Sequence, residues 1–158
     1  MLVPVLISRL LIREMADSQF VTLQEADGSR RFPIAIGLTE AFAIERRLQN
    51  ATPLRPQTHD LLDAVIRELG ATLERIEITD LQGGTFFARL VLDRDGERIE
   101  IDSRPSDALA LGAAYRTPIL VEESVLEEAS QPSESIEGPA GGELIEDDED
   151  EDDDAGFA

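Results

Sequence analysis

Residues 102–107 concentrate side chains that can hold a phosphate group or a divalent cation. They read Asp-Ser-Arg-Pro-Ser-Asp, which places two carboxylates, a guanidinium and two hydroxyls between a predicted strand and a predicted helix. The free N–H groups at a helix start attract anions, and Arg104 can add a bidentate fork to a phosphate. The carboxylates of Asp102 and Asp107 can bind a divalent cation. The alternative is a capped helix with an internal Arg–Asp ion pair.

His59 and Asp60 form a second candidate. His59 is the only histidine and follows a proline-containing loop. It could act as a general acid or base or as a metal ligand, with Asp60 orienting it. The alternative is that His59 has no chemical role and is a partly exposed histidine near a helix cap. Glu40, beside another predicted helix start, and Asp80, at a strand end, are further candidates with a structural alternative, since acids in a first turn favour the helix dipole.

The composition excludes several classes of catalyst. All 14 basic residues are Arg, and there is no Lys, Cys or Trp. Without Lys there is no G-K-[ST] nucleotide loop and no Schiff base; without Cys there is no thiol nucleophile, zinc finger or iron–sulfur cluster. Chemistry is therefore confined to carboxylates, Arg, hydroxyls and one histidine, which favours metals with oxygen ligands.

The net charge of −20 is unevenly distributed along the chain. Residues 131–158 hold 12 acids and no base, whereas residues 1–130 carry a net charge of −8. The acidic segment has too little apolar surface to offset its ordering entropy. We therefore predict one domain at 1–130 and a disordered acidic tail at 131–158, which a basic protein partner could bind. The arginines form only sequence pairs, at 30–31 and 46–47, so no basic patch is expected.

The apolar pattern predicts an α+β domain. Apolar runs and alternation indicate strands, and turn signals such as Asp95-Gly96 indicate hairpins. We expect strands at 3–12, 19–26, 30–36, 71–81, 85–92, 97–103 and 118–121, and helices at 40–49, 59–69, 107–115 and 122–129. This order predicts a mostly antiparallel mixed sheet of about six or seven strands with three or four helices. Pro33 places its strand at a sheet edge or a bulge.

The helices are predicted to begin at hydroxyl caps and to bury apolar faces. The predicted N-caps are Thr39, Thr58 and Ser106. The first helix is expected to bury a stripe of Ala41, Ile44 and Leu48. The second is expected to present a wide apolar face of Leu61, Leu62, Val65, Ile66 and Leu69.

The N-terminal run is apolar but is not expected to enter a membrane. It is interrupted by Pro4 and Arg9 and is far shorter than the roughly 20 apolar residues of a membrane span. It also lacks the features of an export signal. We therefore expect a cytoplasmic protein.

Four short blocks stand out as a set. They are FPIAIG with EA and AI after it (32–44), RPQTHDL (55–61), DL followed by GTFFA (80–88), and DSRPSDA with a later PI (102–119). Together they closely resemble the bifunctional nuclease domain family, also called the DNase/RNase domain family. The resemblance covers about residues 3–128. Tyr115-Arg116 and Gln57 depart from the family pattern, and neither departure removes a candidate ligand.

The resemblance implies a nuclease active on DNA and RNA, and a domain that forms a homodimer or higher homo-oligomer. The roles of individual residues are our hypothesis. The predicted catalytic residues are His59, Asp60, Arg104 and Asp107, with Arg104 and Ser106 binding phosphate. The predicted ligands of Mg²⁺ or Mn²⁺ are Asp102, Asp107, Glu40 and Asp80. Two alternatives stay open: a non-catalytic regulatory or anion-binding module, and an acidic tail that folds back and suppresses the site.

Overall fold

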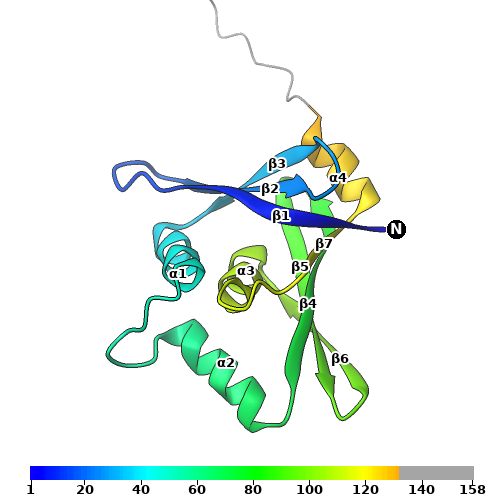
Figure 1. Ribbon diagram of the computed structural model, residues 1–158. Coiled ribbons are helices and arrows are strands. Elements are labelled where there is room, and N and C mark those ends of the chain that lie inside the picture. Colours follow the sequence, from blue (N-terminus) through cyan, green and yellow to red (C-terminus); the bar gives the residue numbers. More distant parts are fainter. Residues whose placement is uncertain (132–158) are drawn as a thin grey trace, which may run out of the picture.

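The computed structural model describes residues 1–131, an α+β domain built on one sheet (Figure 1). The strands are β1 (Leu2–Leu11), β2 (Gln19–Glu25), β3 (Arg31–Ile36), β4 (Thr72–Gln82), β5 (Thr85–Arg94), β6 (Glu97–Ser103) and β7 (Ile119–Glu122). The helices are α1 (Leu38–Leu48), α2 (Thr58–Glu68), α3 (Pro105–Ala113) and α4 (Glu123–Ser130). The predicted fold class is confirmed. The predicted acidic tail lies, apart from Gln131, outside the described residues.

The seven strands form a mixed sheet in the order β3-β2-β1-β7-β4-β5-β6. Neighbouring strands are antiparallel except β4 and β7, which run parallel. The β5–β6 hairpin turns at Asp95 and Gly96, whose φ angles of 52° and 82° suit the right-handed twist of the strands. Pro33 lies in β3, which is an edge strand as predicted. An edge strand has no neighbour on one side, so a residue without an N–H group is tolerated there.

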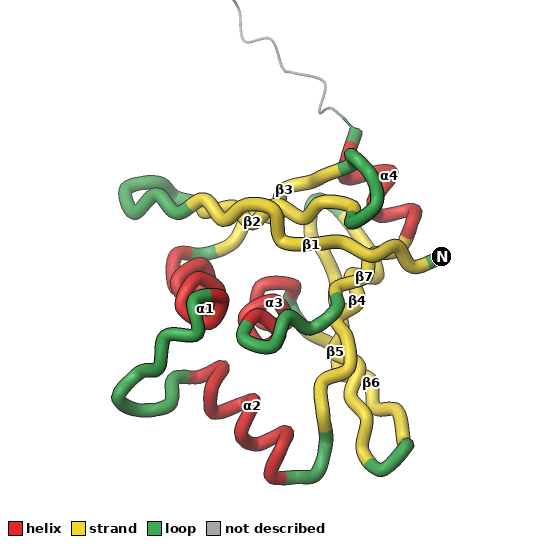
Figure 2. Tube along the Cα trace, viewed as in Figure 1, coloured by secondary structure: helices red, strands yellow, loops and turns green. Residues whose placement is uncertain are grey.

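The sheet is strongly bent, with α3 inside the bend between β1–β3 and β4–β6 (Figures 1 and 2). α3 contacts β4, β5, α1 and α2, and almost all of its side chains are buried. Gly112 lies so close to β4 that an added Cβ would come within 2.7 Å of Ile76 Cδ1. α3 is therefore the central helix of the domain, and its first turn begins with the buried Pro105 and Ser106.

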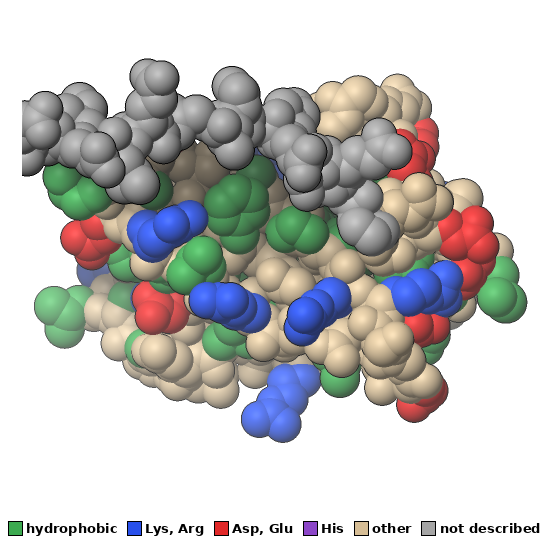
Figure 3. Space-filling model, turned by 90° about the horizontal axis from the view of Figure 1, so that it is seen from above, with side chains coloured by type: hydrophobic (Ala, Val, Ile, Leu, Met, Phe, Trp, Pro, Cys, Tyr) green, Lys and Arg blue, Asp and Glu red, His purple; other side chains and the backbone are tan. Residues whose placement is uncertain are grey.

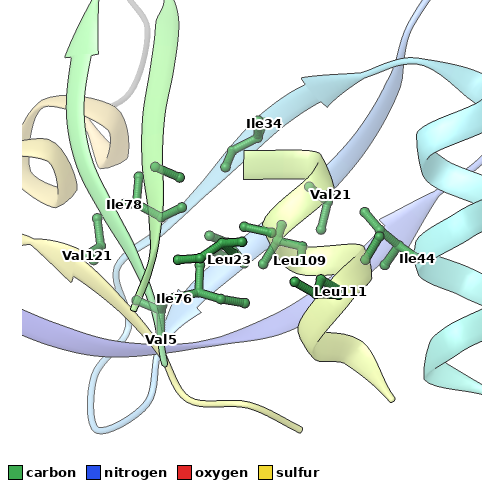
Figure 4. Close-up of a cluster of buried hydrophobic side chains, with 14 of the residues drawn as sticks. Val5, Val21, Leu23, Ile34, Ile44, Ile76, Ile78, Leu109, Leu111 and Val121 are labelled. Atoms are coloured by element: carbon green, nitrogen blue, oxygen red, sulfur yellow. The ribbon is translucent and has the colours of Figure 1, made fainter. Parts of the chain in front are cut away.

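The core fills the concave side of the sheet. Its buried side chains include Leu23 of β2, Ile44 of α1, Ile76 and Ile78 of β4, and Leu109 and Leu111 of α3 (Figure 4). Phe32 of β3 stacks on Phe86 of β5 with ring centroids 5.4 Å apart, which joins the two halves of the bent sheet. Each fully buried side chain of this size contributes about 1.5–3 kcal/mol.

The predicted N-caps are wrong by one or two residues. The helices begin with Gly37, Gln57 and Arg104 as N-caps, so Thr39, Thr58 and Ser106 all lie inside the first turn. At α3 the reason is Pro105, whose fixed φ suits the first helical position and starts the helix before Ser106.

The predicted apolar faces of α1 and α2 are also only partly buried. On α1, Leu48 is 41% exposed and Arg47 takes the buried place instead. On α2, Ile66 is buried, but the other four apolar side chains of its predicted face are 38–69% exposed: Leu61, Leu62, Val65 and Leu69. Among residues 1–131, no helix is long and apolar enough to cross a bilayer.

Candidate functional site

The starts of α1, α2 and α3 converge on a cleft of about 610 Å³. Four of the predicted site residues line it: Glu40 of α1, His59 of α2, and Arg104 and Asp107 at the start of α3. These side chains come from three separate segments of the sequence. The tertiary structure therefore gathers half of the predicted set in one place.

Asp107 is the central group of this cleft. Its Oδ1 lies 3.0 Å from His59 Nε2, and its Oδ2 accepts a 2.8 Å hydrogen bond from Arg104 Nε. Arg104 Nη2 also donates to Asp107 Oδ1 at 3.2 Å and to Glu40 Oε1 at 3.3 Å. The four groups thus form a continuous hydrogen-bonded chain from Glu40 through Arg104 and Asp107 to His59.

The charges of this chain stabilise one another. Burial raises the pKa of the Asp107 carboxyl, but hydrogen bonds with Arg104 and His59 outweigh it and hold that pKa below its ordinary value. The hydrogen bond with Asp107 raises the pKa of Arg104. The Arg104 side chain is 64% exposed and that of His59 only 13%. The guanidinium can therefore turn toward an incoming anion while the imidazole stays in place.

The backbone at the start of α3 explains this geometry. Arg104 is the N-cap in an extended conformation (φ −67°, ψ 144°), as expected for a residue before proline. Its side chain reaches across the first turn to Asp107, three residues later. The Asp107 carboxylate also lies at the positive end of the helix dipole, which favours its charged form.

Asp60 does not orient His59, contrary to the prediction. Its carboxylate accepts hydrogen bonds from Arg46 Nη2 at 2.8 Å, Arg47 Nη1 at 2.7 Å and the Gln57 N–H at 2.9 Å. Burial raises the pKa of Asp60, but these three donors outweigh it and keep that pKa below its ordinary value. Asp60 ties the start of α2 to α1, and it positions His59 only through the backbone.

Arg47 is a structural residue that the sequence reasoning missed. It is 5% exposed, and it donates from Nε to the Ala110 carbonyl at 2.6 Å and from Nη2 to the Leu111 carbonyl at 2.9 Å. These carbonyls belong to the last turn of α3, where helical partners run out. Arg47 therefore caps α3 while it pairs with Asp60. The sequence did contain an indication that Arg47 is buried, because it follows Ile44 by three residues and so lies on the apolar face of the helix.

Asp80, Asp102 and Ser106 do not line the cleft. Asp80 accepts a 2.8 Å hydrogen bond from the N–H of its neighbour Leu81, and Asp102 is exposed on β6. Ser106 is buried and, with Arg104, lines a second hollow of about 370 Å³ beside the cleft. Arg104 thus lies between the two hollows.

The predicted four-acid metal site is not preassembled. Within residues 1–131, no three His, Asp or Glu side chains gather closely enough to share one ion. Arg104 instead forms ion pairs with two of the three acids that line the cleft, Glu40 and Asp107; the third acid is Glu45. Two carboxylates still suit Mg²⁺, which usually binds one or two of them together with substrate phosphates and water.

Comparison with known proteins gives consistent matches. The family model described as the bifunctional nuclease domain matches residues 21–134. Two uncharacterized proteins of Mycobacterium tuberculosis strains are each 42% identical over 128 residues, covering 80% of this chain and 76% of theirs. Bifunctional nuclease 1 of Oryza sativa subsp. japonica is 27% identical over 116 residues, covering 71% of this chain and 35% of the rice protein.

Proposed function

The chain belongs to the bifunctional nuclease domain family, and from this premise we propose that it hydrolyses phosphodiester bonds in DNA and RNA. The observation that carries the proposal is the cleft in which His59, Arg104 and Asp107 meet. Phosphodiester hydrolysis needs a group that moves a proton and a group that balances the charge developing on the phosphate. The cleft contains both.

Arg104 is the proposed phosphate ligand. Its guanidinium is charged and exposed, and its present partners are carboxylates, whose geometry a phosphate oxygen pair reproduces. The first-turn N–H groups of α3, which have no carbonyl partner within the helix, add partial positive charge on the same side. Removing a hydrogen-bond donor that stabilises the transition state, the role proposed for Arg104, typically lowers kcat about 10²–10³-fold.

His59 is the proposed proton-transfer group, with Asp107 as its orienting carboxylate. When Nε2–H donates to Asp107, Nδ1 is left as the proton acceptor for an attacking water. The carboxylate holds the ring and stabilises the imidazolium that proton transfer produces. Loss of a positioned acid or base typically lowers the rate about 10²–10⁴-fold.

A divalent cation remains a prediction. Glu40 and Asp107, two of the three acids that line the cleft, could hold Mg²⁺ or Mn²⁺ together with phosphate oxygens of a substrate. Such an ion would supply charge neutralisation at the phosphate. Asp80 and Asp102, from the original ligand set, would have no part in it unless the protein rearranged.

The proposal is tested with purified protein on single-stranded DNA and RNA, with and without EDTA. We expect His59→Gln, Arg104→Gln and Asp107→Asn each to lose at least 10²-fold in rate, while Asp93→Asn, on β5 away from the cleft, keeps it. Undiminished cleavage in EDTA would show that no divalent cation is needed. Full activity of the three cleft variants would exclude this cleft as the active site.

Self-association is a further part of the proposal, and the exposed face of α2 supports it. Leu61, Val65 and Leu69 lie on successive turns, and all are 45–69% exposed. Apolar side chains that gather on one helix face usually mark an interface. We propose that a second copy of this chain covers them.

A non-catalytic phosphate-binding module is the second candidate. It is favoured by the pairing of Arg104 with two carboxylates, which satisfies the guanidinium without any substrate. If highly purified protein cleaves neither nucleic acid but a mononucleotide raises its melting temperature, this candidate replaces the nuclease.

A further inference from the structure

Five of the 14 arginines form no ion pair with an acid among residues 1–131. They are Arg9, Arg13, Arg31, Arg55 and Arg116. Two of them, Arg9 and Arg31, are exposed and belong to the same half of the sheet. Their spacing in the sequence did not indicate that these two arginines share one part of the surface.

The strand register places Arg9 and Arg31 on one face. Arg9 of β1 pairs with Thr22 of β2, and Arg31 of β3 pairs with Gln24 of β2. Leu23, between these two β2 residues, is fully buried, so Thr22 and Gln24 face away from the core. Two strand spacings and two residues of rise separate the two arginine Cα atoms by roughly 12 Å.

This outer face carries no acid to neutralise the arginines. The segments that form it, 6–11 in β1, 20–24 in β2 and 31–35 in β3, contain no Asp or Glu. Figure 3 looks onto this side of the molecule and shows a row of arginine side chains across it, with acidic side chains beside the two ends of the row. On β4–β6, by contrast, Arg75 and Arg89 hydrogen-bond the buried Glu77.

β3 leads from this face to the second hollow, which shares Arg104 with the candidate cleft. Arg31 and Ile36 at its two ends are about 17 Å apart at the usual rise per residue. Near the far end, Ala35 lines the second hollow together with Arg104, and Asp17 is the one acid of that hollow. A chain of phosphates lying along β3 would thus meet Arg31 first and Arg104 last.

The half-buried Phe20 adds a feature that suits nucleic acid. Phe20 is two residues before Thr22 on β2, so its side chain lies on the same face of the sheet. It pairs with Leu11 of β1 on one side and with Ala35 of β3 on the other. Arginines beside an aromatic ring on an open sheet form the usual platform for single strands, since phosphates pair with the cations and bases stack on the ring.

We propose that this strip, Arg9 and Arg31 with Phe20, binds the backbone of single-stranded nucleic acid and directs it along β3 to Arg104. The idea rests on the proposed nuclease function for its direction, but binding to the strip can be measured without cleavage. The competing occupant is the chain's own acidic run, 146–154, which carries the same charge as a nucleic acid.

The binding test uses the full chain and a 12-nucleotide phosphorothioate single strand that resists cleavage. Fluorescence anisotropy at several salt concentrations compares the parent with Arg9→Gln/Arg31→Gln. Each lost phosphate contact reduces the salt slope by about 0.7, so the double variant should lose about 1.4 and bind roughly tenfold more weakly at 0.15 M salt. Arg94→Gln, an exposed arginine at the end of β5, should change neither quantity.

Two results would overturn the proposal. One is a double variant with the affinity and salt slope of the parent. The other is dependence on Arg9 and Arg31 that appears only after acids 146–154 are replaced by amides, since the chain's own acidic run would then occupy the strip.

A kinetic comparison separates the strip from the cleft. The double variant should raise KM about tenfold for the 12-nucleotide phosphodiester strand and leave the hydrolysis of bis(p-nitrophenyl) phosphate, which is too small to reach the strip, unchanged. Equal loss on both substrates would overturn the strip. If the parent cleaves neither substrate but the binding result holds, the nuclease function fails and the strip stands.

Discussion

Replacing Arg47 with Met should lower the free energy of unfolding by about 3–5 kcal/mol. The side chain is 5% exposed, and its hydrogen bonds to Ala110, Leu111 and Asp60 measure 2.6, 2.9 and 2.7 Å. A hydrogen bond to a charged group contributes about 1.5–3 kcal/mol, which makes a gross loss of about 4.5–9 kcal/mol. Part of this gross loss is offset, because the variant no longer has to remove a charged guanidinium from water when it folds. The net loss expected for breaking a buried ion pair is therefore the value of about 3–5 kcal/mol given above.

Urea unfolding followed by circular dichroism measures this change. With a slope of about 1–3 kcal/mol per M, the midpoint should fall by roughly 2 M. Arg94→Met is the matched control. Arg94 is 48% exposed and lies 3.8 Å from Glu97, so its loss should change stability by less than about 1 kcal/mol.

The loss of Arg47 should also affect the candidate cleft. Without Arg47, the end of α3 and the start of α2 lose their shared partner, so the position of His59 and the proposed nuclease activity should be affected together with stability. A loss below about 1 kcal/mol would refute the view that Arg47 is a buried cap, and would mean that water or Arg46 replaces its bonds.

Three further substitutions test other parts of the structure. Asp107→Asn should destabilise the protein more at pH 7 than at pH 2. The pKa of the carboxyl is lowered in the folded protein, so its contribution to stability is fully present above the unfolded pKa of about 3.9 and is lost as the pH falls through the folded pKa. Equal destabilisation in thermal unfolding at both pH values would contradict this. Glu77→Gln should lower the free energy of unfolding by about 2 kcal/mol. This loss is smaller than that for breaking a fully buried ion pair, because the partners Arg75 and Arg89 are 25% and 35% exposed. An unchanged melting temperature would show that the ion pairs of Glu77 make no net contribution to stability. Val65→Glu should shift the mass measured by light scattering toward the monomer, and an unchanged mass would exclude the α2 face as the contact between copies.

The order of strands and helices followed directly from the sequence. The alternation of Phe32, Ile34 and Ile36 is a local signal, and each of these side chains is buried as its period requires. The turn at Asp95-Gly96 is equally local, because few residues other than Gly, Asn and Asp tolerate positive φ there. Helix starts were less well predicted, since several first-turn residues can satisfy the free N–H groups.

The burial of helix faces was harder to predict. The apolar pattern of α2 predicted a buried face, but whether anything covers a face depends on where the neighbouring elements lie. α2 contacts α3 and β4 along only part of its surface, and Leu61 and Leu69 remain exposed. A helix pattern shows which side is apolar and not what packs on it.

The sequence by itself determined the chemistry available to this protein: acids, arginines, hydroxyls and one histidine, with residues 102–107 as the segment of greatest interest. Only the tertiary structure decided the pairing. It assigned His59 to Asp107 and Asp60 to Arg46 and Arg47. The physical reason is that a hydrogen bond requires two groups within about 3 Å, and for residues on different elements this distance is set by the packing of the whole core.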